Sequence, residues 1–258
     1  MSPSKRIIAV ANQKGGVGKT TTSINLATAL AACGRSVLLI DFDPQGNAST
    51  GLGIDDRTHN SYSLIAGGSG SDESIQKTQV PQLDIIPTVV DLSAAEVELS
   101  DMPDREFRLR GAISRISASY DYIIIDCPPS LGMLTVNALA AATSVLVPLQ
   151  CEFYALEGLS QLMRTIDAVK AGLNGALSMQ GIVLTMFDSR NKLSAMVAND
   201  VRDHFGELVY NTVVPRNVRV SEAPSFGQPV LIYDLKCSGS QAYAALAAEL
   251  LRQEAKAA

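Results

Sequence analysis

Short apolar runs alternate along this chain with longer segments in which apolar residues recur at helical spacing. The runs are rich in isoleucine and valine, which is typical of strands buried on both faces of a parallel sheet. The pattern predicts an α/β fold, doubly wound, in which helices cover both faces of a mostly parallel sheet. Strands are predicted at residues 7–12, 36–41, 83–87, 122–126, 144–149, 181–186 and 212–214, and helices at 20–33, 92–99, 106–119, 132–142, 155–171, 193–205 and 240–253.

The stretch from residue 46 to residue 70 interrupts this pattern, because it is polar and rich in glycine. We expect loops with short helices there. No linker divides the chain, so residues 1–258 are predicted to form a single domain. An apolar content of 47% with few aromatic residues suits helices packed on an aliphatic sheet and excludes general disorder.

Charge and cysteine content set further bounds. The formal charge of −5 gives no global sign of nucleic-acid binding, so any DNA contact must come from a local patch. The four cysteines include no C-x-x-C pair, which favours reduced thiols over a disulfide framework or a zinc site. The apolar run at residues 7–11 is too short for a signal peptide, and no run is long enough to cross a bilayer. We therefore expect a cytoplasmic protein.

A glycine-rich loop between the first predicted strand and the first predicted helix has the composition of a phosphate-binding loop. Glycines let backbone N–H groups turn toward an anion, and the helix that follows directs its positive dipole end at the same place. Lys19 supplies charge for the β- and γ-phosphates, and the Thr20 hydroxyl can ligate Mg²⁺. The predicted nucleotide-binding residues of the loop are Lys14, Gly15, Gly16, Val17, Gly18, Lys19, Thr20 and Thr21.

The loop departs from the general Walker A pattern at its head. That pattern has a glycine, four further residues and then Gly-Lys-Thr. In this chain the first position is not glycine, and a second lysine, Lys14, lies at the head of the loop. The sequence therefore carries a deviant form of the motif. Because the loop lies between an apolar strand and a helix, as the mechanism requires, we interpret it as a nucleotide site.

Carboxylates end two of the predicted strands. Asp41 and Asp126 each close an apolar run, and in an open parallel sheet ligands bind outside the carboxyl ends of the strands. We expect Asp126 to support the Mg²⁺ shell, through water because Mg²⁺ dehydrates reluctantly. Asp43 is predicted to position the attacking water, with Asp41 supporting the metal. The alternative that Asp41 and Asp43 exchange these roles stays open.

Four segments together resemble the chromosome- and plasmid-partitioning ATPases of the ParA/Soj type, members of the deviant Walker A (MinD/ParA) superfamily of P-loop NTPases. The glycine loop alone would identify only that superfamily. The runs Asp-Pro-Gln-Gly-Asn at residues 43–47 and Ser-Glu-Ala-Pro-Ser at residues 221–225 are more specific. The chain resembles the short chromosomal form. The four segments are residues 11–22, 41–47, 125–130 and 215–225, and they span most of the chain in order.

The resemblance implies a homodimer that encloses two ATP molecules with Mg²⁺. In this family the lysine that matches Lys14 reaches the phosphates of the partner's nucleotide, much as an arginine finger does, and such fingers are worth about 10³ to 10⁵ in rate in GTPases. Gly15 would have to stay small, because a side chain there would occupy the space between the nucleotides. Lys14, Lys19 and Asp43 are thus the expected catalytic residues.

The resemblance also implies a base site and a DNA-binding surface. The adenine would lie between Met186 and the turn formed by Pro215, Arg216 and Asn217, with Asn217 bonding its edge. Arg190 and Arg219 match positions where partitioning ATPases carry DNA-binding arginines. They would contact double-stranded DNA without sequence preference.

The family's cycle implies further partners. ATP would favour a DNA-bound dimer on the nucleoid, and hydrolysis would release monomers. A ParB/Spo0J-type centromere-binding protein would stimulate hydrolysis through a short basic N-terminal segment. Whether the cargo is a chromosome or a plasmid is left open by the residues.

Three alternatives share parts of the pattern. A MinD-like cell-division ATPase would anchor to membrane through a basic amphipathic tail, but residues 243–258 are alanine-rich, carry both charges and lack Phe and Trp. An iron–sulfur reductase would need thiols at a dimer axis, for which Cys127 is only a superficial candidate. A synthetase with a carboxylating half-reaction would need a second substrate pocket that the sequence does not indicate.

Overall fold

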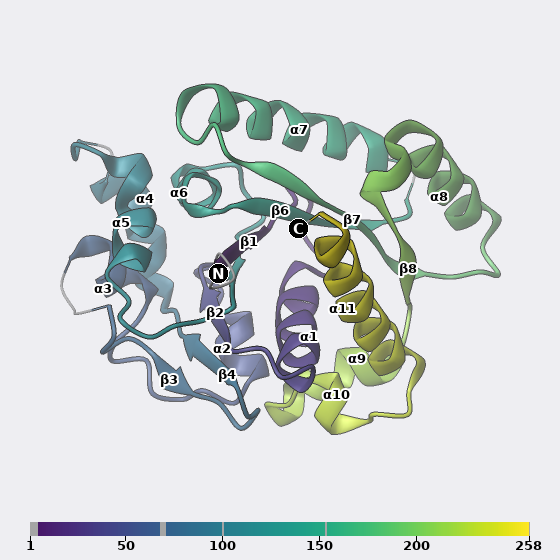
Figure 1. Ribbon diagram of the computed structural model, residues 1–258, viewed down its shortest axis with the longest axis horizontal. Helices are drawn as coiled ribbons and strands as arrows, with labels where there is room; N and C mark the ends of the chain where they lie inside the picture. Colours follow the sequence, from purple (N-terminus) through teal and green to yellow (C-terminus); the bar gives the residue numbers. More distant parts are fainter. Residues whose placement is uncertain (1–4, 68–70, 100, 153, 258) are drawn as a thin grey trace.

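The computed structural model describes residues 5–67, 71–99, 101–152 and 154–257. Within these residues the chain forms an eight-stranded sheet in the order β3-β4-β2-β5-β1-β6-β7-β8 (Figure 1). The strands are β1 Arg6–Val10, β2 Val37–Asp41, β3 Gln76–Lys77, β4 Leu83–Ile86, β5 Tyr122–Asp126, β6 Ser144–Gln150, β7 Ser178–Phe187 and β8 Val209–Pro215.

All neighbouring strands run parallel except β3 and β4. The central strands are buried along most of their length, which is why their sequences are continuously apolar. Asp126 at the end of β5 is in register with Val10 on one side and Asp41 on the other. The predicted α/β, doubly wound, mostly parallel sheet is therefore confirmed, and its register brings the strand-end carboxylates together.

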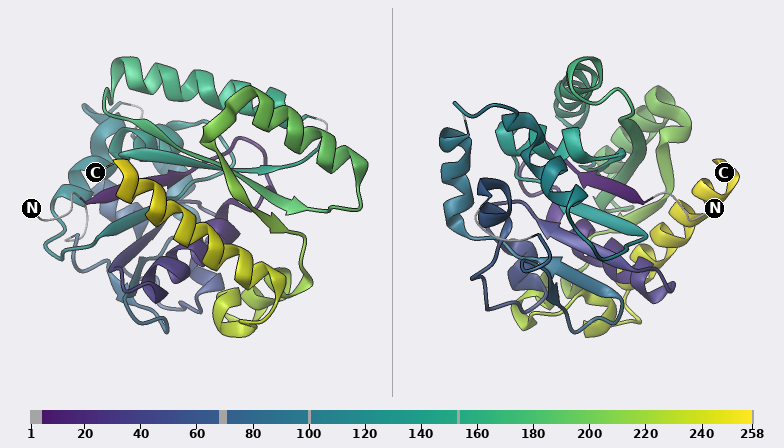
Figure 2. Two further views of the ribbon diagram at one scale, coloured as in Figure 1. Left: turned by 45° about the vertical axis from the view of Figure 1, so that its right-hand side comes forward. Right: turned by 60° about the vertical axis from the view of Figure 1, so that its left-hand side comes forward.

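Helices cover both faces of the sheet, with a separate apolar core on each side. Figure 2 shows α7 and α11 on opposite sides of the sheet. Four short 3-10 turns connect the larger elements among the described residues: Val90–Ala94, Arg105–Phe107, Gly206–Leu208 and Ala223–Phe226. One face carries α1 Lys19–Ala32, α2 Asn47–Gly51, α9 Val218–Glu222, α10 Val230–Tyr233 and α11 Ser238–Ala257, and the other carries α3 Ser61–Ala66, α4 Ala95–Glu98, α5 Arg108–Ser114, α6 Met133–Ala141, α7 Ala155–Gly172 and α8 Lys192–Phe205.

The predicted helices at residues 92–99 and 106–119 are wrong in extent. The first is a 3-10 turn followed by the four residues of α4, and the second is a 3-10 turn followed by α5, which ends at Ser114. Beyond α5 the chain turns toward Asp72, whose carboxylate accepts hydrogen bonds from the backbone N–H and hydroxyl of Ser117. This tertiary contact overrides the helical pattern.

Short helices were expected between residues 46 and 70, and α2 and α3 confirm them. Residues 68–70 of that stretch lie outside the described residues. The two-residue strand β3 was not predicted, because it is too short to leave a periodic signal.

Strands β7 and β8 are longer than predicted and irregular. Gly181 lies in β7 with a φ of +147°, and a Cβ there would meet the Tyr210 ring at 2.7 Å, so only glycine fits. The register between β7 and β8 shifts twice. Backbone N–H groups in the irregular part of β8 find their acceptor on α11. The buried carboxylate of Glu249 accepts hydrogen bonds from the N–H groups of Asn211 at 2.7 Å and Thr212 at 2.9 Å.

Candidate nucleotide site

The glycine loop occupies the carboxyl end of β1 and leads into α1. Gly16 and Gly18 adopt φ values of +73° and +88°, a conformation that favours glycine. The Asn12 side chain pins the head of the loop, because its Oδ1 accepts the backbone N–H of Lys14 at 3.0 Å while its amide donates to the Pro148 carbonyl at 2.8 Å. The loop is thus fixed to both β1 and β6.

The two lysines of the loop lie in different surroundings. Lys19 is 6% exposed, and its Nζ donates to the carbonyl of Lys14 at 3.0 Å. Burial lowers the pKa of Lys19, and the charges of Asp126 and Asp43 oppose this shift. Lys19 is therefore held inside the loop as a fixed charge.

A cavity of about 310 Å³, called the phosphate cavity below, adjoins the loop. Asp43 and Met186, which are far from the loop in sequence, both line it. The cavity therefore brings together most of the predicted phosphate-binding residues with one predicted catalytic acid and one predicted base-site residue. Its lining residues are Gly15, Gly16, Gly18, Lys19, Thr20, Thr21, Asp43, Gln45, Asn47, Pro129 and Met186.

Asp41 and Asp126 are a fully buried pair at the ends of neighbouring strands, and neither lines this cavity. One oxygen of each carboxylate is held by a serine: Ser23 donates to Asp126 Oδ1, and Ser49 donates to Asp41 Oδ2. Asp41 Oδ1 and Asp126 Oδ2 are buried and have no hydrogen-bond partner among the described residues. Buried carboxylate oxygens left in this state are costly unless a cation or a proton satisfies them.

The electrostatics of the pair fit a divalent cation. Burial raises the pKa of Asp126, and the charge of Asp41 raises it further, whereas the nearby hydroxyls of Thr20 and Ser23 oppose the shift. Burial likewise raises the pKa of Asp41. No group of three His, Cys, Asp or Glu side chains in the described part of the chain could hold a metal ion. Two buried carboxylate oxygens without partners fit Mg²⁺, which keeps several of its waters and is bound through one or two carboxylates.

Asp43, in contrast to Asp41, lines the phosphate cavity. It is 5% exposed, and its Oδ1 accepts the backbone N–H of Gln45 at 3.0 Å. Burial raises the pKa of Asp43, and the Gln45 N–H and the charge of Lys19 oppose the shift. Of the two roles left open for the acids, this placement favours Asp43 as the residue next to the reacting phosphate.

Lys14 does not line the phosphate cavity of its own subunit. Its side chain is 42% exposed, and its Nζ pairs with the carboxylate of Glu152, which follows β6. A Cβ added to Gly15 would meet nothing within 4 Å in this chain. Among the described residues, no neighbouring atom therefore excludes a side chain at position 15.

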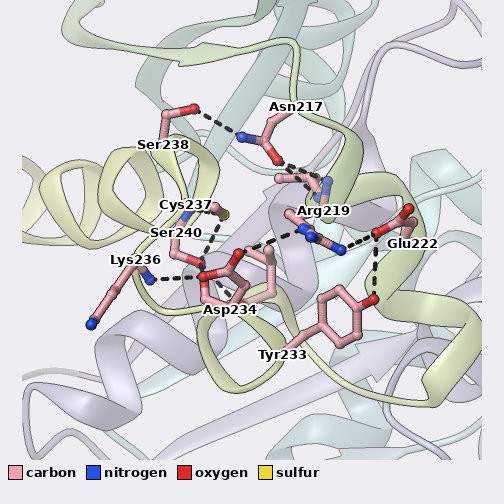
Figure 3. Close-up of polar contacts among 11 residues, drawn as sticks. Asn217, Arg219, Glu222, Tyr233, Asp234, Lys236, Cys237, Ser238 and Ser240 are labelled. Carbon is pink, nitrogen blue, oxygen red and sulfur yellow. Dashed lines mark hydrogen bonds and ion pairs between the residues drawn. The ribbon is translucent and has the colours of Figure 1, made fainter.

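The predicted base-site residues are only partly brought together. Met186, which has a φ of +49°, and Arg216 line a second cavity of about 360 Å³ beside the phosphate cavity. Pro215 ends β8. Asn217 instead caps α9, since its Oδ1 accepts the backbone N–H of Arg219 at 2.8 Å and its amide donates to Ser238 at 2.9 Å (Figure 3). The Asn217 side chain is therefore hydrogen-bonded within the chain at both its oxygen and its nitrogen.

Both predicted DNA-binding arginines are exposed and paired with carboxylates. Arg190 forms two hydrogen bonds of 3.0 Å with Asp188. Arg219 lies between Glu222 at 3.0 Å and Asp234 at 3.6 Å, as Figure 3 shows. These pairs offset the positive charge that each arginine would offer to a phosphate.

Sequence reasoning missed Ser23, Ser49 and Glu152. Ser23 lies one helical turn after Lys19, and that spacing on the loop helix could have indicated it. Ser49 and Glu152 lie on other segments, and their contacts depend on how those segments pack, so the sequence held no comparable signal.

The strand, deviant glycine loop, helix and strand-end carboxylates define a P-loop ATPase of the deviant Walker A type. The family model described as AAA domain matches residues 5–179. The chain is 61% identical over 253 residues to the chromosome partitioning protein ParA of Caulobacter vibrioides (strain NA1000 / CB15N), covering 96% of this chain and 95% of that protein. It therefore belongs to the ParA/Soj family of chromosome-partitioning ATPases, as the sequence motifs predicted.

Two other comparisons agree with this assignment. The sporulation initiation inhibitor protein Soj of Bacillus subtilis (strain 168) is 51% identical over 247 residues, covering 95% of this chain and 98% of that protein. A structure of cobyrinic acid a,c-diamide synthase from Mycobacterium smegmatis with bound ADP and magnesium superposes with a TM-score of 0.86 at 37% identity, covering 98% and 97% of the two chains. Among the described residues, no helix is long and apolar enough to cross a membrane.

Proposed function

We propose that this chain is a DNA-segregation ATPase whose nucleotide controls its assembly. ATP with Mg²⁺ drives formation of a homodimer that binds double-stranded DNA without sequence preference. Hydrolysis of ATP returns the protein to monomers. The single observation that carries the proposal is that Lys14, at the head of the phosphate loop, lies outside the phosphate cavity of its own subunit.

The chemistry inside one subunit follows from the cavity. Lys19 and the loop N–H groups bind the phosphates, and Thr20, Asp126 and Asp41 hold the Mg²⁺ and its waters. Bound Mg²⁺ neutralises charge that develops on the phosphates. Asp43 lines the cavity and orients the attacking water. The solved structure with ADP and magnesium at 37% identity supports this choice of nucleotide and metal.

Lys14 acts in the partner subunit. Lys14 does not line the phosphate cavity of its own subunit. It precedes Gly15, where a Cβ would meet no atom within 4 Å. A two-fold dimer that brings the two loops together exchanges both lysines symmetrically. The open space at Gly15 is then filled by the partner's nucleotide and lysine. Each Lys14 has to leave Glu152 to make this contact.

DNA binding resides in Arg190 and Arg219. Both lie on the segments that follow β7 and β8, at the same edge of the sheet as the nucleotide. A dimer doubles them, so that four arginines contact the phosphate backbone. The net charge of −5 means that this local patch, and not the whole surface, attracts DNA. The protein is then cytoplasmic and nucleoid-associated.

A centromere-binding protein of the ParB/Spo0J type is the proposed stimulator of hydrolysis. Relatives named as chromosome partitioning proteins support a partner of this kind. A MinD-like membrane role has less support, because α11 buries its apolar residues Tyr243, Leu246 and Leu250 in the core and leaves no apolar face for lipid.

The proposal is tested with Lys14→Ala. Static light scattering with ATP and Mg²⁺ is expected to show a dimer for the wild type and a monomer for the variant, which binds ATP less cooperatively. Lys256→Ala, which removes an exposed lysine from the far end of α11, is the matched control and stays dimeric. A fully dimeric Lys14→Ala protein would overturn the assignment. A gel-shift assay with and without ATP then tests DNA binding directly.

A further inference from the structure

Two buried serines hold the strand-end carboxylates, each from a different helix. We infer that Ser23 and Ser49 are positioning residues for the metal site: each binds one oxygen of its carboxylate and thereby leaves the other oxygen free for Mg²⁺ and its waters. The inference rests on the proposed Mg²⁺-dependent nucleotide binding. It adds two residues that do not touch the nucleotide but set the geometry of Asp126 and Asp41.

Ser23 acts from the phosphate-loop helix. It is fully buried, and its Oγ lies 2.8 Å from Asp126 Oδ1 and 3.1 Å from the carbonyl of Lys19. The oxygen of Asp126 is the closer acceptor, so it takes the stronger bond. Because Ser23 lies one helical turn beyond Lys19, the helix that carries the phosphate-binding lysine also orients Asp126.

Ser49 acts from α2, and its hydroxyl has a fixed direction. The backbone N–H of Thr88 donates to Ser49 Oγ at 3.1 Å, so the hydroxyl proton is left for Asp41 Oδ2 at 2.6 Å. The backbone N–H of Ser49 donates to the same oxygen at 2.7 Å. Two donors on one oxygen prevent the carboxylate from rotating, and the other oxygen, Oδ1, has no partner among the described residues.

These contacts connect the metal site to the phosphate cavity. Asn47, two residues before Ser49, lines that cavity, as does Gln45. A shift of α2 would therefore change the hold on Asp41. Partners that orient metal-binding groups typically change metal affinity by about 10- to 100-fold when they are removed.

Ser61 offers a matched control. It is fully buried like the other two serines, and its Oγ bonds the backbone carbonyl of Asp41 and the carbonyl of Pro87. Removing its hydroxyl costs a buried hydrogen bond next to Asp41 without touching the carboxylate. Ser61→Ala therefore separates loss of stability from loss of carboxylate position.

The experiment measures Mg²⁺ affinity without turnover. The thermal stabilisation of the full chain by ADP is titrated with Mg²⁺, and Mn²⁺ binding with ADP is followed by electron paramagnetic resonance. Ser23→Ala and Ser49→Ala are each expected to raise the half-saturating Mg²⁺ concentration about tenfold or more. Ser23→Thr and Ser49→Thr, which keep the hydroxyl, restore it, and Ser61→Ala lowers thermal stability with wild-type Mg²⁺ affinity.

The outcomes distinguish this inference from the proposed function. If ADP stabilises the wild type equally with and without Mg²⁺, the proposed Mg²⁺-dependent site is wrong, and the inference with it. If the wild type responds to Mg²⁺ but both alanine variants match Ser61→Ala in affinity, only the positioning role is overturned. If one alanine variant does not fold, the threonine variant at that position and the alanine variant at the other serine still test the positioning role.

Discussion

The nucleotide edge and the outer surface of this ATPase hold their charged side chains in different ways. At the edge, Asp41, Asp126 and Lys19 are buried. The two carboxylates accept hydrogen bonds from neighbouring helices, and Lys19 donates to the carbonyl of Lys14 in its own loop. On the surface, Arg190 and Arg219 have side chains 88% and 54% exposed and pair with acids two or three residues away or on a neighbouring turn.

Lys14 follows the surface pattern although it belongs to the phosphate loop. Its side chain is 42% exposed and paired with one carboxylate, that of Glu152. Ion pairs between exposed side chains contribute only about 0 to 1 kcal/mol, so they are easily exchanged for another partner. The comparison indicates that groups acting inside the subunit are fixed by burial, whereas groups proposed to act on another molecule are held by exchangeable pairs.

The largest effect is expected at the nucleotide edge, from Asp43→Ala. Because Asp43 is proposed to position the attacking water, its loss is expected to reduce ATP turnover by at least about 100-fold. ATP-dependent dimerisation remains, because the phosphate-binding groups are intact. Phosphate release and light scattering measure the two properties, with the exposed Asp55→Ala as control. Retained hydrolysis would remove Asp43 from this role.

On the outer surface, Arg219→Glu is expected to weaken DNA binding by about tenfold or more in the presence of ATP, because it reverses a charge in each subunit. Arg219→Ala should lower the slope of log affinity against log salt by about one unit for each DNA phosphate that the arginine no longer neutralises. Filter binding over a salt series measures both. Unchanged DNA binding in Arg219→Glu would refute the assignment.

The converse change tests whether the paired acids restrain the arginines. Glu222→Gln removes the carboxylate 3.0 Å from Arg219, so a few-fold tighter DNA binding is expected at low salt. Asp188→Asn should act in the same way through Arg190. Gel shifts at two salt concentrations measure the gain, and Glu157→Gln on the distant α7 is the control. Weaker binding in Glu222→Gln would show that the carboxylate orders Arg219 for DNA.

The smallest effect on function is expected from Glu249→Gln, which alters a buried carboxylate outside the nucleotide edge. Burial alone raises the pKa of Glu249, but hydrogen bonds from Thr212 and Asn211 outweigh it and lower the pKa below the ordinary value of 4.5. A lowered pKa in the folded state means that the ionised group stabilises the fold above pH 4.5 and loses this effect as the pH falls further.

Glu249→Gln should therefore cost about 1 to 3 kcal/mol at pH 7, and the difference from the wild type should shrink below pH 4.5. Urea unfolding at several pH values measures it. ATP-dependent DNA binding of the folded variant is expected to be unchanged. A stability difference that grows as the pH falls would mean that folding raises the pKa of Glu249 instead of lowering it.

Much of the nucleotide edge could be predicted from the sequence, because its signals are local. The glycine loop, Asp41 and Asp126 each end or follow an apolar strand, and parallel strands bring their carboxyl ends to one edge. The strand pattern predicted the sheet for the same reason. Helix extents failed where a distant contact, such as that of Ser117 with Asp72, ended the helix early.

The pairs on the outer surface could not be predicted in this way. The contact of Lys14 with Glu152 depends on β1 and β6 lying side by side. The position of Asp234 beside Arg219 depends on how α10 packs against α9. The same holds for one buried contact at the nucleotide edge, because Ser49 reaches Asp41 only through the packing of α2 at the end of β2. Such contacts are set by tertiary packing and leave no periodic signal in the sequence.

The central claim, that Lys14 acts in the partner subunit, is tested most directly by mixing two inactive variants. A dimer of Lys14→Ala with Asp43→Ala has one complete site, in which the Lys14→Ala subunit supplies Asp43 and its partner supplies Lys14. At equal concentrations with DNA present, the mixture is expected to hydrolyse ATP at up to about a quarter of the wild-type rate. The heterodimer keeps one of the two cross-subunit lysine contacts, and co-purification of differently tagged subunits with ATP checks that it forms. A mixture that forms heterodimers yet is as inactive as each variant alone would contradict action of Lys14 in the partner subunit.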